Sequence, residues 1–182
     1  VTDHANSSLA QERKALREAA TLFCTEVRRE AIRGLPTDEQ LQRLSPFITP
    51  ELRSILKQAC VYQDMQIRKH PDEKPAWIEG DLFSSLFEGV TSWEVGDAFG
   101  APMVDPWAKV KQTYSEPGQK PETWTDTLLF KQRDGRLLVD EAIGDNVQQI
   151  TDDARDFVRT LGQLQTIVGL RAEYYVSTND IK

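Results

Sequence analysis

The chain has few side chains of the kinds that hold metal ions or act as paired nucleophiles. Its 182 residues include two cysteines, Cys24 and Cys60, and two histidines, His4 and His70, with no CxxC pair. A metal site is therefore not expected. The sequence also has no GxSxG motif, no glycine-rich phosphate loop and no dinucleotide fingerprint, so no cofactor is expected. An enzyme built on this chain would have to use carboxylates and tyrosines.

Long hydrophobic runs and clustered positive charge are also missing. No apolar stretch approaches the roughly 18 residues that a membrane-spanning helix needs, so we expect no membrane insertion of this chain. The formal net charge is −7, and no stripe of lysine and arginine offsets it. Because this charge repels phosphate groups, nucleic acid is not an expected partner.

The composition is typical of one folded domain. Hydrophobic residues make up 39% of the chain and charged residues 28%, which is not the balance of a disordered chain. The length fits one core, so we expect residues 1–182 to form a single domain. Residue 1 is Val and not Met, which would fit a chain from which an export signal or lipid-attachment segment has been removed.

Three helices are predicted over about residues 8–70. The first is long and amphipathic, because its apolar residues recur at spacings of three and four. Thr37, followed three residues later by Gln40, predicts a capping box for a short second helix. Thr49 and Pro50 supply an N-cap and a first-turn proline for the third.

The two cysteines fall on the apolar stripes of the first and third predicted helices. If a short connection folds these helices together, Cys24 and Cys60 can form a disulfide, which would indicate an oxidising compartment. Closing that loop of about 36 residues would stabilise the fold by about 4 kcal/mol. The alternative is two buried thiols that pack as small hydrophobic side chains.

After residue 80 the pattern changes from helical to strand-like. Strands are predicted over about residues 91–98, 107–114, 124–133 and 136–143, in a sheet layer that covers about residues 90–145. Asp134-Gly135 predicts a two-residue type I′ turn, because both positions of that turn need positive φ. A helical pattern returns over about residues 152–170. The expected class is α+β, with N-terminal helices packed on a curved C-terminal antiparallel sheet.

The turn also sets an expected register for the last hairpin. Counting back from it gives the cross-strand pairs Phe130–Val139, Leu128–Glu141 and Asp126–Ile143. Asp126 and Glu141 would then share the apolar face of the sheet, as diagonal neighbours in a pocket. The alternative places both acids at an open rim, where water solvates them.

Five residues are therefore the predicted ligand-binding set. They are Asp126, Glu141, Trp124, Tyr114 and Gln112, which combine aromatic walls with a few polar groups. Asp81, in the run Glu79-Gly80-Asp81, is a further acid that could serve a cation or amine site. A cap for a helix over about residues 82–87 is the more ordinary role for it.

Two stretches carry a resemblance to a known group. They are Ile78-Glu79-Gly80-Asp81-Leu82-Phe83-Ser84-Ser85-Leu86-Phe87-Glu88-Gly89 and the later Trp124-Thr125-Asp126 with Asp134-Gly135-Arg136-Leu137-Leu138-Val139-Asp140. With the order of the elements, they resemble the NTF2-like α+β proteins, and more narrowly the bacterial exported proteins and lipoproteins of the DUF3828 type. The resemblance covers about residues 10–145. It implies a cone-shaped fold and a periplasmic or outer-membrane-anchored location.

The resemblance implies a fold better than a function, because NTF2-like proteins include enzymes and pure binding modules. We expect a non-catalytic binding protein with a pocket on the concave face of the sheet. A periplasmic protein-interaction module, such as an inhibitor or immunity protein with a basic target, is the alternative. An acid–base enzyme that uses Asp126 and Glu141 comes third. The oligomeric state is left open, with a homodimer among the options.

Overall fold

The computed structural model describes residues 2–75, 80–85, 88–101 and 104–143. Within them the chain forms α1 (Thr2–Glu30), α2 (Asp38–Leu44), α3 (Pro50–Lys69), β1 (Ser92–Ala101), β2 (Val104–Tyr114), β3 (Glu122–Arg133) and β4 (Arg136–Ile143). The helix predicted over residues 152–170 lies outside the described residues.

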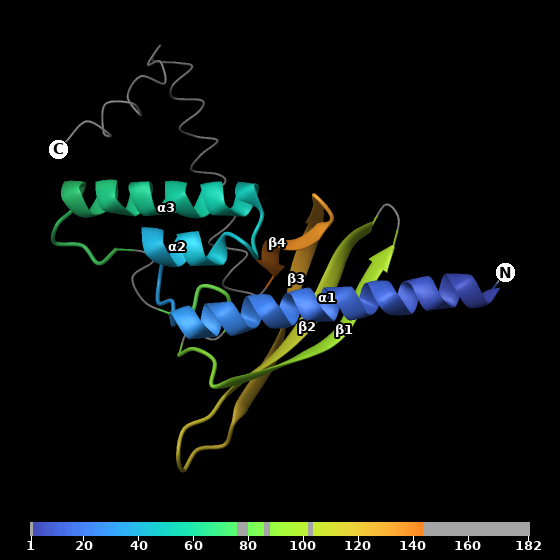
Figure 1. Ribbon diagram of the computed structural model, residues 1–182. Helices are drawn as coiled ribbons and strands as arrows, with labels where there is room; N and C mark the ends of the chain where they lie inside the picture. Colours follow the sequence, from blue (N-terminus) through green and yellow to red (C-terminus); the bar gives the residue numbers. More distant parts are fainter. Residues whose placement is uncertain (1, 76–79, 86–87, 102–103, 144–182) are drawn as a thin grey trace.

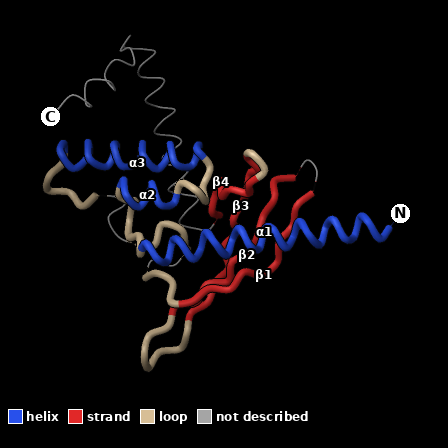
Figure 2. Tube along the Cα trace, viewed as in Figure 1, coloured by secondary structure: helices blue, strands red, loops and turns tan. Residues whose placement is uncertain are grey.

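The four strands form an antiparallel sheet in the order β1-β2-β3-β4. The sheet is open, and α1 crosses it and contacts β1, β2 and β4 (Figures 1 and 2). The predicted α+β class, with N-terminal helices packed on an antiparallel sheet, is confirmed.

The helix ends follow local rules that the sequence predicts. Thr37 caps α2 through its side chain, and Gln40 completes the capping box. Thr49 caps α3, with Pro50 in the first turn. α1 ends at Glu30, and the next residue, Ala31, adopts a positive φ of 47°, which does not continue a helix.

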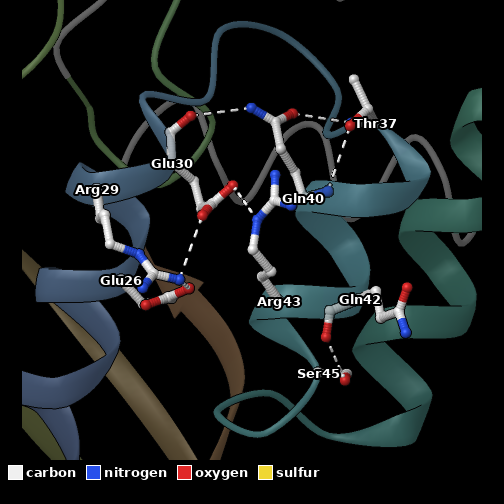
Figure 3. A network of polar contacts seen from close by, with 8 residues as sticks. All are labelled: Glu26, Arg29, Glu30, Thr37, Gln40, Gln42, Arg43 and Ser45. Carbon is white, nitrogen blue, oxygen red and sulfur yellow. Dashed lines mark hydrogen bonds and ion pairs between the residues drawn. The ribbon is translucent and has the colours of Figure 1, made fainter.

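Polar contacts hold α2 against the end of α1 (Figure 3). The Nε atom of Arg43 lies 2.7 Å from a carboxylate oxygen of Glu30, and the Gln40 side-chain amide donates to the Glu30 carbonyl at 2.9 Å. On the α1 side, Arg29 pairs with Glu26 at 2.5 Å. Because Gln40 also belongs to the capping box, the same residue closes α2 and fastens it to α1.

One hydrophobic core runs through both layers. Its buried members include Leu16, Ala20, Phe23, Leu41, Leu44, Leu52 and Leu56 from the helices and Ala98, Ala108, Val110, Leu128, Phe130, Val139 and Ala142 from the sheet. Phe23 meets Phe83 edge to face, with ring centroids 5.3 Å apart. This contact links α1 to the segment that precedes β1.

The hairpin turn forms as predicted, but its register holds only close to the turn. Asp134 and Gly135 have φ angles of 50° and 75°, and Phe130 pairs with Val139. Beyond that pair Leu129 lies opposite Glu141, so that Asp140 is the extra residue of a β-bulge.

Contacts of β4 with the α2–α3 connection account for this bulge. The Thr49 hydroxyl donates to Asp140 at 2.7 Å. On the neighbouring strand β3, Lys131 also pairs with Asp140, at 2.5 Å. The backbone of Val139 exchanges hydrogen bonds with Phe47 and Thr49, each at 2.9 Å. These contacts hold β4 at Val139 and Asp140, so that Asp140 has no partner in the register between β3 and β4.

The bulge makes two of the predicted cross-strand pairs wrong. Leu128 pairs with Ala142 and not with Glu141, and Ile143 pairs with Thr127 and not with Asp126. Because one extra residue exchanges the two faces of a strand, Glu141 lies beside Leu129, on the face opposite to Asp126.

The predicted disulfide is also wrong, since Cys24 and Cys60 are free cysteines. Cys24 faces the sheet side of α1, whereas the Cys60 thiol donates to the carbonyl of Pro36 at 3.5 Å. In Figure 1, α2 lies between α1 and α3. The apolar stripes of α1 and α3 therefore pack on different neighbours. Burial of the Cys60 side chain raises the pKa of its thiol.

Phe130 is 1% exposed and lies at the centre of the sheet side of the core. We expect Phe130→Ala to lower the free energy of unfolding by about 3–5 kcal/mol, because it leaves a cavity where the ring was. Val61→Ala is the control, since Val61 is 47% exposed on α3, and it should change stability by less than about 0.5 kcal/mol. Urea unfolding measures both, and equal small effects would contradict this description of the core.

Candidate functional site

A cavity of about 330 Å³ lies between the second half of α1 and the inner face of the sheet. Its apolar and small lining residues are Phe23, Cys24, Val27, Ala31, Ile32, Phe83, Gly89, Val90, Trp93, Val110 and Leu128, and its polar and charged lining residues are Arg28, Arg33, Asp81, Glu88, Thr91, Gln112 and Tyr114. The walls are therefore mostly apolar, with a small number of groups that can form hydrogen bonds.

The carboxylate of Asp126 lies behind one wall of this cavity. It is 2% exposed and accepts hydrogen bonds from the Ser85 backbone at 2.9 Å and from the Ser85 hydroxyl. It also accepts from the Gln112 amide at 2.9 Å and from the Trp124 indole at 3.3 Å. The solvated-rim alternative is thus wrong for Asp126, which is a buried connection between β3, β2 and the segment before β1.

Asp126 fixes how Gln112 is oriented in the cavity wall. The Nε2 atom of Gln112 donates to Asp126 and lies 3.5 Å from the Phe83 carbonyl. The other amide atom, Oε1, is buried and has no hydrogen-bond partner among the described residues. Gln112 itself is 5% exposed. The wall thus contains a buried acceptor whose hydrogen-bonding capacity is not used within the described protein.

Asp81 is one of two acids that line the cavity, the other being Glu88. Its carboxylate accepts a hydrogen bond from the Phe83 backbone at 2.9 Å, so it closes a turn. The helix expected after it does not form in the described residues 82–85, which are turns and bends. Burial raises the pKa of Asp81, opposed by the Phe83 hydrogen bond and by Arg33, with the charge of Asp126 adding to the rise.

Cys24 lines the same cavity as a neutral thiol. Burial, with a contribution from the charge of Asp81, raises the pKa of Cys24 to about 12. A thiol with this pKa is protonated at neutral pH, and the thiolate is the nucleophilic form. Cys24 therefore acts as a small apolar part of the wall.

The cavity ends at a charged and aromatic edge. Arg28 and Arg33 are exposed there, and Arg33 donates to the Glu88 carbonyl at 2.8 Å. The Tyr114 hydroxyl donates to the Glu116 carboxylate at 2.6 Å, and this bond is the main cause that raises the pKa of Tyr114.

The structure divides the five predicted ligand-binding residues. Gln112 and Tyr114 line the cavity, whereas Trp124, Asp126 and Glu141 do not. Trp124 and Asp126 belong to the hydrogen-bonded group behind the wall, and Glu141 is on the opposite face of the sheet because of the bulge.

The contribution of α1 to the site was missed from sequence. Cys24, Val27, Arg28 and Ala31 recur at spacings of three and four, which marks one helix face. The same spacing is typical of a face that packs fully on a core, so the pattern does not separate a cavity wall from core.

The described residues contain neither a cluster of metal ligands nor a membrane-spanning helix. Their histidine, cysteine and acidic side chains form no group of three or more that could hold a metal ion. None of their helices has both the length and the apolar character needed to cross a membrane.

Comparison with known proteins does not assign a function to this chain. No protein-family model and no curated protein matches the chain. Among solved structures, the chain is similar to the crystal structure of a protein of unknown function from Bacteroides thetaiotaomicron VPI-5482. The identity is 12% and the TM-score 0.40, over 79% of this chain and 96% of that one. The NTF2-like resemblance stays a prediction.

Because Asp126 is buried and accepts hydrogen bonds from three residues, we expect Asp126→Asn to lower the free energy of unfolding by about 2–4 kcal/mol. The asparagine side chain has no charge, and its NH₂ group would face at least one of the groups that donate to Asp126. Glu122→Gln, the same kind of change at an exposed position of β3, should cost less than about 0.5 kcal/mol. Chemical denaturation measures both, and an undiminished stability of the Asp126 variant would contradict the structural role.

The raised pKa of Asp81 gives a pH-dependent prediction. Its ordinary value is 3.8, so the folded protein binds this proton more tightly than the unfolded chain does. The stability gained is fully present below that value and is lost as the pH rises through the higher pKa of the folded state. The free energy of unfolding of the protein, relative to that of Asp81→Asn, should therefore fall as the pH rises above 3.8 and then level off. Denaturation at a series of pH values tests this, and parallel curves would contradict it.

Proposed function

We propose that this is a non-catalytic binding protein that takes a small, largely apolar molecule between α1 and the sheet. The observation that carries the proposal is the cavity of about 330 Å³ with mostly apolar walls. Pockets for small ligands span roughly 300–1,000 Å³ and combine apolar walls with a few polar groups. The cavity lies at the small end of that range, which favours a compact ligand over a peptide.

The walls are suited to a flat or ring-containing ligand. Trp93, Tyr114 and Phe83 line the cavity from β1, β2 and the segment before β1. Aromatic faces of this kind pack against planar apolar molecules with large contact area. Val27 and Ile32 supply the opposing aliphatic wall from the region of α1.

Two observations favour binding over catalysis. The carboxylate pair that an acid–base enzyme would have used is not in the cavity, because Asp126 is hydrogen-bonded behind the wall and Glu141 is on the other face. The Cys24 thiol is protonated at neutral pH, since burial raises its pKa to about 12. The groups that face a ligand are thus suited to contact and hydrogen bonding.

Export is no longer supported by the cysteines, since both are free. A periplasmic or membrane-anchored location follows from the sequence resemblance alone and stays a prediction.

The proposal can be tested with N-phenyl-1-naphthylamine, an apolar probe whose fluorescence rises in an apolar environment. We expect saturable binding to the protein. Val27→Phe places a ring in the cavity from α1 and should weaken this binding by at least about tenfold, because the occupied volume no longer accommodates the probe.

Val61→Phe is the matched control, since it makes the same change on the exposed side of α3 and should leave probe binding unchanged. Thermal melts establish that both variants are folded. Absence of saturable binding, or equal binding by the folded Val27 variant, would overturn the proposal.

A further inference from the structure

The orientation of the Gln112 amide is fixed by charge. Its Nε2 atom lies 2.9 Å from a carboxylate oxygen of Asp126. Exchanging the two ends of the amide would place Oε1 at that distance from the carboxylate, with two acceptors facing each other. Nε2 therefore faces Asp126, and Oε1 is the end of this cavity-lining side chain that has no partner among the described residues.

The Oε1 atom is buried and has no donor among the described residues. An unsatisfied buried acceptor costs free energy, and that cost is recovered when a donor reaches it. Such an atom in the wall of a cavity is a specific recognition point, because it rewards an occupant that donates and penalises one that does not.

The neighbouring hydroxyls of the wall do not supply this donor. The Thr91 hydroxyl donates to the Thr113 carbonyl at 2.9 Å, and the Tyr114 hydroxyl donates to Glu116 at 2.6 Å. Each hydroxyl has a single proton to donate. Neither hydroxyl is therefore available to Oε1, and among the described residues it has no donor that an occupant of the cavity would have to displace.

Charge restricts what kind of donor fits. Asp81 lines the cavity, and Asp126 lies 2.9 Å from the Gln112 amide, so both carboxylates would repel an anionic group placed at Gln112. The lining cations Arg28 and Arg33 lie at the exposed edge of the cavity. A full positive charge would have to lose its hydration in a largely apolar space, where Arg33 already interacts electrostatically with Asp81. A neutral donor avoids both costs.

We propose that the ligand enters the cavity with a neutral hydrogen-bond donor, a hydroxyl or an amide N–H on an apolar ring or chain, and that Gln112 Oε1 accepts this hydrogen bond. The inference rests on the proposed function of the cavity and names the class of ligand. Because Oε1 has almost no surface open to solvent, the proposal requires neighbouring side chains of the wall to shift when the donor binds.

Three naphthalene derivatives test the roles of the donor and of charge. The measured quantity is the concentration at which each displaces N-phenyl-1-naphthylamine. 2-Naphthol carries a neutral O–H donor, 2-methoxynaphthalene has the donor masked by a methyl group, and 2-naphthoate is an anion. We expect 2-naphthol to displace the probe at a concentration about tenfold lower than 2-methoxynaphthalene does, the size of one buried hydrogen bond. The masked compound is the more apolar of the two, so burial of apolar surface alone predicts the reverse order. 2-Naphthoate should be the weakest of the three.

Gln112→Met removes the acceptor and keeps a side chain of similar length. The preference for 2-naphthol over its methyl ether should disappear in this variant. Gln132→Met makes the same change at an exposed position of β3 and should preserve the preference. The comparison of the three compounds on the unaltered protein does not depend on whether the Gln112 variant folds.

The outcomes distinguish this inference from the function on which it rests. Equal displacement by 2-naphthol and its methyl ether, with the probe still bound in the cavity, overturns the inference and leaves the binding function standing. The same holds if a crystal structure with 2-naphthol shows a water molecule on Oε1 and the hydroxyl elsewhere. If the probe does not bind in the cavity at all, the proposed function fails first.

Discussion

The arrangement of the site depends on one buried carboxylate. Asp126 holds Ser85 from the segment before β1, Gln112 from β2 and Trp124 from its own strand. A buried carboxylate that accepts several hydrogen bonds loses less by leaving water than it would alone, and it holds its donors in fixed positions. Without these bonds, the 80–85 segment would have fewer contacts to hold it beside the sheet, and one wall of the cavity would lose its position.

The two ends of the Gln112 amide are in different situations. Asp126 uses the donor end of the Gln112 amide, and the acceptor end is left buried without a partner in the described residues. The opposing wall is the second half of α1, whose end is fastened by the contacts of Glu30 with Gln40 and Arg43. The contacts of Asp126 thus hold the sheet wall of the cavity, and the contacts of Glu30 hold the end of the α1 wall.

Sequence reasoning succeeded where a feature is decided by neighbours along the chain. The caps at Thr37 and Thr49 and the turn at Asp134-Gly135 depend on a few adjacent residues. It failed where a distant contact decides. Asp140 becomes the extra residue of a bulge as Thr49, 91 positions away, bonds to it, and this moved Glu141 to the other face. The cysteines lie on apolar stripes as expected, but stripes do not reveal which helices face each other. Gln112, Tyr114 and Asp81 were named as candidates from the sequence, whereas the contribution of α1 to the cavity wall needed the tertiary structure.

The central claim is that a small molecule binds between α1 and the inner face of the sheet, against Gln112. Two-dimensional ¹H–¹⁵N NMR of the labelled protein during titration with 2-naphthol tests it most directly. The account predicts saturable shifts that cluster on Val27, Gly89 and the side-chain amide of Gln112, which line the cavity, with α3 unaffected. Shifts centred on the exposed Val61 and Met65 of α3, or no saturable shifts at all, would contradict it.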